Sequence, residues 1–90
     1  MYIEYVTTND FKVLHQLRAV EEGSTMMEKF DNAIKRLEAT GFKRVNEKLL
    51  GNSDWINGET HAYIHFESLD AARANIEREA KYCHEYSFLD

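Results

Sequence analysis

The alternation of apolar and polar residues predicts that the chain begins with a β-hairpin. Residues 2–7 (YIEYVT) alternate and are rich in β-branched and aromatic side chains, which favours a strand. Turn-forming residues follow at 8–10, and residues 11–20 alternate again, which favours a second strand. The alternative for residues 11–20 is a helix that starts at Asn9 or Asp10 and buries Phe11, Leu14 and Leu17.

Two later segments carry the apolar spacing of helices. In the first, Thr25 and Glu28 match a capping box, and Gly41 followed by Phe42 fits a Schellman end. Ser68 is a suitable N-cap for the second helix. The apolar stripe predicted for the first helix is Met26 or Met27, Phe30, Ala33, Ile34 and Leu37. The stripe predicted for the second is Leu69, Ala72, Ile76, Ala80 and Cys83, and residues 86–90 are expected to form a short tail.

Asn57-Gly58, between the two predicted helices, indicates a second hairpin. Asn-Gly between apolar-rich runs favours a type I′ turn, because that turn needs a positive φ at both positions. The arms are expected at about residues 43–56 and 59–67, and Gly51 indicates a bulge or bend in the first arm.

This order of elements predicts one α+β domain that spans residues 1–90. Each helix has a single apolar stripe and needs a sheet to cover it. We therefore expect a two-layer ββαββα fold, in which a four-stranded, mainly antiparallel sheet carries both helices on one face. A chain of 90 residues is long enough for a single small core.

The charge of the chain argues against nucleic acid and membrane as partners. The net charge is −5, from 16 acidic and 11 basic residues, and the basic residues cluster no further than the pairs Lys35-Arg36 and Lys43-Arg44. Nucleic-acid binders usually carry a basic stripe. No apolar run is long enough to span a bilayer, and the N-terminus has no features of a signal peptide. With Cys83 as the only cysteine, no internal disulfide can form, and we expect a cytoplasmic location.

The alternating residues His61, Tyr63 and His65 raise the question of a metal site. In a strand they share one face, and the apolar residues between them face the core. The Cα atoms of the two histidines then lie roughly 13 Å apart, at about 3.3 Å per residue, which is too far for both to bind one zinc ion. The two-residue turn places His61 opposite Asp54, which supplies no third ligand. We therefore expect no metal site and no cofactor, and we expect the histidines to point away from the helices.

The outer face of the predicted sheet favours contact with another protein. It carries several apolar and aromatic side chains, a composition typical of partner surfaces. The alternative is an amphipathic face with scattered aliphatic residues and no partner. Trp55 is expected either to cap the end of the core or to be an exposed anchor. The candidate interface residues are Leu14, Leu50, Trp55, His61, Tyr63 and His65.

His15 is a further candidate for acid–base chemistry. His15 lies on the same face of the predicted strand as Leu17, so we expect it to face the core. A turn centred on residues 9–10 places Glu4 opposite His15, whereas a three-residue turn places Ile3 there. A buried Glu–His pair is more often a structural contact than a proton-transfer device. The sequence also contains no nucleotide-binding, zinc-protease or hydrolase motif. We therefore expect no catalytic residues and no enzyme activity.

The sequence thus favours a small acidic protein that acts by protein–protein contact as an adaptor, regulator or stoichiometric inhibitor. Its acidity would speed association with a basic target, and its size and charge are typical of phage- or plasmid-encoded inhibitors. One alternative is a homodimeric domain that binds a small ligand between helices and sheet or between two sheets. Another is a small enzyme that uses Glu4 and His15, or the face with His61 and His65. That alternative requires these groups to converge within hydrogen-bond distance.

Overall fold

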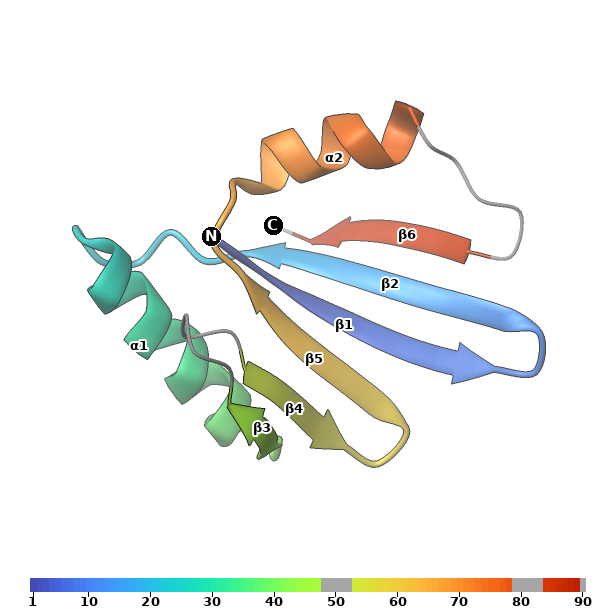
Figure 1. Cartoon of the computed structure of the whole chain (residues 1–90), viewed down its shortest axis with the longest axis horizontal. Coiled ribbons are helices and arrows are strands. Elements are labelled where there is room, and N and C mark those ends of the chain that lie inside the picture. The colour runs from blue at the N-terminus through green and yellow to red at the C-terminus, as the bar shows by residue number, and fades with distance from the viewer. Residues whose placement is uncertain (48–52, 79–83, 90) are drawn as a thin grey trace.

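The chain forms an α+β fold in which two helices pack on a six-stranded mixed sheet (Figure 1). The computed structural model describes residues 1–47, 53–78 and 84–89. The elements are β1 (Tyr2–Asn9), β2 (Lys12–Ala19), α1 (Met26–Ala39), β3 (Lys43–Glu47), β4 (Ser53–Asn57), β5 (Thr60–His65), α2 (Leu69–Arg78) and β6 (His84–Leu89). The strand order is β3-β4-β5-β1-β2-β6. Neighbouring strands are antiparallel except β2 and β6, which are parallel.

The two helices cover opposite faces of this sheet. Helix α1 packs on Ile3, Ala62 and Ile64, whereas α2 packs on Tyr2 and Leu17. Consecutive residues of a strand point to opposite sides, so Tyr2 and Ile3 lie on different faces. We call these the α2 face and the α1 face. In Figure 1, α1 lies near the β3 edge and α2 lies alongside β2 and β6.

The α+β class and the mainly antiparallel pairing are confirmed, but the sheet has six strands rather than the predicted four, and the helices lie on opposite faces rather than on one. The predicted arm 43–56 is in fact two strands, β3 and β4, which pair with each other and have an irregularity between Arg44 and Asn46. The bulge expected at Gly51 lies outside the described residues. Residues 86–89, which were predicted to lie in a tail, belong to β6, which pairs with β2.

The sheet topology explains why the helices lie on opposite faces. Strands β2 and β3 run in the same direction, as do β5 and β6, so each helix lies within a crossover connection. One crossover leads toward the β3 edge and the other toward the β6 edge. Two crossovers of the same hand that lead toward opposite edges place their helices on opposite faces.

The ends of α1 confirm the predicted helix boundaries. The Thr25 hydroxyl accepts a hydrogen bond from the Glu28 amide at 3.2 Å, as a capping box requires. The Glu28 carboxylate also accepts from the amide of Ser24 at 2.7 Å. At the other end of α1 the amide of Phe42 donates to the Leu37 carbonyl at 2.9 Å. This is the six-residue hydrogen bond that defines a Schellman motif.

Residues 12–19 form a strand, which confirms the strand prediction over the helical alternative. Both hairpin turns, however, lie at other residues than expected. The first turn is Asp10-Phe11, with a φ of 55° at Asp10. The second is Gly58-Glu59, with a φ of 61° at Gly58. In each turn only the first of the two turn residues has a positive φ, which fits a type II′ turn. For the second turn the sequence had predicted type I′. Asn57 is the last residue of β4, and its side-chain amide donates to a backbone carbonyl of the segment that follows α1.

Candidate functional site

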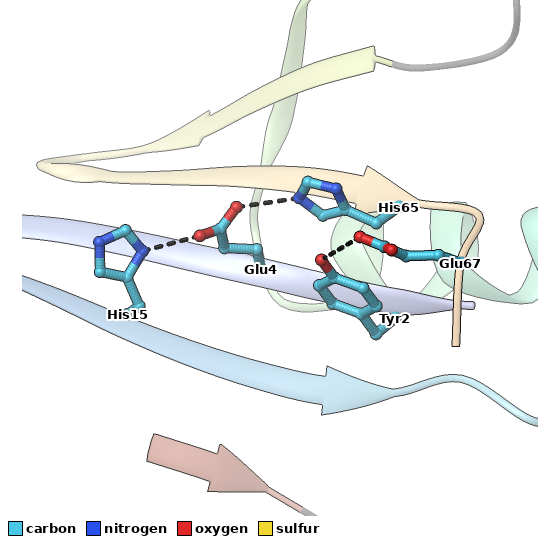
Figure 2. A network of polar contacts seen from close by, with 5 residues as sticks. All are labelled: Tyr2, Glu4, His15, His65 and Glu67. Atoms are coloured by element: carbon cyan, nitrogen blue, oxygen red, sulfur yellow. Dashed lines mark hydrogen bonds and ion pairs between the residues drawn. The ribbon is translucent and has the colours of Figure 1, made fainter. Parts of the chain in front are cut away.

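Three polar side chains from three neighbouring strands meet on the α2 face (Figure 2). The Glu4 Oε2 atom lies 2.7 Å from His15 Nδ1, and Oε1 lies 2.9 Å from His65 Nε2. The direct ladder neighbours of Glu4 are Leu17 and Tyr63, so each histidine is a diagonal neighbour two residues along its strand. Diagonal positions are within reach of long side chains. We call Glu4, His15 and His65 the His–Glu–His cluster.

Two tyrosine rings stack on the two imidazoles of the cluster. The Tyr2 and His65 ring centroids are 4.5 Å apart with an interplanar angle of 10°, and those of Tyr86 and His15 are 4.4 Å apart at 15°. The Tyr2 hydroxyl donates to Glu67 Oε1 at 3.3 Å (Figure 2). Burial raises the pKa of both tyrosines, and nearby carboxylates raise it further. Both phenols are therefore neutral at physiological pH.

The Glu4 carboxyl is ionised at neutral pH. Hydrogen bonding from His65 lowers its pKa below 4.5, burial opposes this effect, and hydrogen bonding from His15 adds to it. The cluster is largely enclosed, with 10% of the His15 side chain exposed, 19% of Glu4 and 34% of His65. A carboxylate in this position fixes the orientation of both imidazoles and holds three strands together.

The geometry meets one condition of the enzyme alternative, because Glu4 and His15 do converge within hydrogen-bond distance. The predicted register was nevertheless wrong, since Val6 rather than Glu4 or Ile3 lies opposite His15.

His61, Tyr63 and His65 share one face, as predicted, but this is the α2 face and not a face free of helices. His65 belongs to the cluster, whereas His61 is exposed and Tyr63 is half-buried. The shifted turn places Tyr63 opposite Asp54 and His61 opposite Ile56. The predicted pairing of His61 with Asp54 was therefore wrong.

The other predicted interface residues do not join this surface. Trp55 is 3% exposed and packs in the core under α1, with the Arg44 guanidinium 5.0 Å from its ring centroid. It is therefore a core residue and not an exposed anchor. Leu14 pairs with Thr7 and lies on the α1 face, opposite to Tyr63. Leu50 lies outside the described residues.

The described part of α2 covers only part of the α2 face. The apolar contacts of α2 involve β1, β2 and β6, and among the described residues none of them comes from β4 or β5. There Val6 pairs with His61, His61 pairs with Ile56, and Tyr63 lies next along β5. We call Val6, Ile56, His61 and Tyr63 the open strip. Ile56 was missed from the sequence, because it joins Tyr63 only once the register is known.

The described part of the chain shows no metal centre and no membrane-spanning helix. No three histidine, cysteine, aspartate or glutamate side chains within it are placed to hold one metal ion. Neither described helix combines the length and apolar character needed to cross a membrane. A scan against models of protein families and searches of curated proteins and of solved structures found no match.

Proposed function

We propose that this protein acts by contact with another protein through the open strip. The observation that carries the proposal is the arrangement of Val6, His61 and Ile56 in one row across three paired strands, with Tyr63 beside them. Side chains held on paired strands lose little further freedom on binding, which lowers the entropic cost of association. Tyrosine is enriched in interface cores, because its ring adds apolar area and its hydroxyl adds a hydrogen bond.

The charge of the chain supports a partner with a basic surface. The excess of acidic residues, 16 against 11 basic ones, attracts such a partner over a distance and raises the association rate. A domain of this size acts most simply by occupying a surface, as an adaptor, regulator or stoichiometric inhibitor. Binding should therefore weaken as the salt concentration rises.

Site-specific photo-cross-linking in the native host tests this proposal. A photoreactive residue at His61, which is exposed on the open strip, should give a covalent product with the partner. The matched control places the same residue at Asn75, which is exposed on α2. Tyr63→Ala, combined with the photoreactive residue at position 61, should abolish the cross-linked product, because it removes the aromatic ring of the open strip.

Three outcomes would contradict the proposal or a part of it. Equal cross-linking from positions 61 and 75 would show that the open strip is not preferred. A product of two copies of this chain, with no other protein, would replace the proposed partner by a homodimer. A complex that survives high salt would leave the surface in place but reject the basic partner.

A further inference from the structure

A groove lies on the α1 face, on the side of the molecule opposite to the open strip. Its volume is about 320 Å³, at the lower end of the range of roughly 300–1,000 Å³ for small-molecule sites. It lies between the sheet and the segment that follows α1. The lining residues are Tyr5, Thr7, Gln16, Arg18, Thr40, Phe42, Thr60 and Leu89.

Arg18 is the one charged side chain among the lining residues. It is exposed, and no described residue forms a hydrogen bond or an ion pair with its guanidinium. Arg36 is different, because it donates to the Ala19 carbonyl and pairs with Glu22 at 3.2 Å. The groove therefore has a positive charge that its own lining does not neutralise.

Two hydroxyl groups add a hydrogen-bond donor to the groove. Thr7 Oγ1 and Thr60 Oγ1 lie 2.9 Å apart and share one hydrogen bond. Each hydroxyl carries one hydrogen, so the threonine that accepts this bond keeps its own hydrogen for another acceptor.

The rest of the groove is largely apolar. The rings of Tyr5 and Phe42 lie 5.6 Å apart with an interplanar angle of 52°, and Leu89 is also among the lining residues. Rings in this arrangement offer apolar area to a flat ligand, and aromatic pairs favour tilted or offset packing. Apolar walls with a few polar groups that can act on one ligand are typical of small-molecule sites.

We propose that this groove binds a small organic carboxylate with an apolar, preferably aromatic, body. Its carboxylate pairs with the Arg18 guanidinium, and its body packs against Tyr5, Phe42 and Leu89, toward the Thr7–Thr60 pair at the other end of the groove. A guanidinium matches a carboxylate in two parallel hydrogen bonds. The single uncompensated cation favours a monoanion over a phosphate dianion.

Amide chemical shifts of the full chain, followed by NMR, test this inference. Phenylacetate should shift the amides of Thr7, Arg18 and Thr60 in a saturable way. Neutral phenylacetamide, which has nearly the same shape, should bind about tenfold more weakly or worse, because it lacks the charge. Phenyl phosphate should bind no more tightly than phenylacetate.

Variants separate a specific site from general attraction to positive charge. Arg18→Gln should weaken phenylacetate binding about tenfold. Arg78→Gln, at an exposed arginine of α2, is the matched control and should change nothing. Equal losses in the two arginine variants, or equal binding of phenylacetamide, would overturn the inference. Tighter binding of phenyl phosphate, or no saturable shift with phenylacetate, benzoate or hexanoate, would also overturn it.

Discussion

The Glu4 carboxylate and the His15 imidazole lie 2.7 Å apart, although the two residues are not direct neighbours in the ladder between β1 and β2. The second oxygen of Glu4 bonds to His65 on β5, so one carboxylate links three strands. Removing one partner of a buried hydrogen-bonded pair costs more than the pair itself contributes, because the remaining groups lose their partner. Among the three residues of the cluster, replacement of Glu4 should therefore lower the free energy of unfolding most.

Glu4→Gln should lower the free energy of unfolding by about 1–3 kcal/mol, because the amide keeps the shape but removes the charge that both imidazoles contact. Urea unfolding measures this loss. Glu85→Gln is the matched control, since Glu85 forms an exposed ion pair with Lys12 at 2.9 Å. Exposed pairs contribute roughly 0–1 kcal/mol. Equal losses in the two variants would show that the cluster stabilises the fold no more than a surface pair does.

The stability that depends on Glu4 should be lost in acid. The pKa of Glu4 in the folded protein lies below its ordinary value of 4.5. Its contribution is therefore fully present above about pH 4.5 and is lost as the pH falls through the folded pKa. The difference in unfolding free energy between wild-type and Glu4→Gln should shrink between pH 5 and pH 3. A difference that stays constant over this range would contradict the assignment.

The sequence predicted α1 well because its signals are local. The Thr25 cap, the apolar stripe and Gly41 all act within a few residues, and Gly41 has the expected positive φ, at 89°. One error arose at the start of the stripe, where Met26 and Met27 are exposed. Apolar residues in the first turn of a helix therefore do not always reach the core.

The cluster and the helix placement could not be predicted from local patterns. His65 lies 61 residues from Glu4, and they meet only because β1 pairs with β5. A one-residue error in either turn changes which side chains face one another, and both turns were misplaced. The signal for β6 was present, since Tyr86 and Phe88 alternate with polar residues, but the segment is short and its partner β2 is distant in sequence.

Thr25→Ala should destabilise the protein by about 1 kcal/mol through loss of the α1 cap. The Thr25 hydroxyl accepts from the Glu28 amide, and without it that donor has no side-chain acceptor. Thermal and urea unfolding measure the effect. Thr25→Ser keeps the hydroxyl and should retain most of the stability. If the serine variant loses as much as the alanine variant, the hydroxyl is not the cause.

Gly58→Ala should cost about 1–2 kcal/mol, because an L-residue with a side chain rarely adopts the φ of 61° found at Gly58. An added Cβ at this position meets no described atom within 4 Å, so the cost comes from the backbone rather than from a clash. Glu59→Ala, at the second position of the same turn, is the matched control and should change stability by less than roughly 0.5 kcal/mol. Urea unfolding of both variants decides the point, and amide chemical shifts of β4 and β5 report whether the pairing of Ile56 with His61 survives. A Gly58→Ala variant as stable as wild-type would contradict the positive φ, and with it the register that forms the open strip.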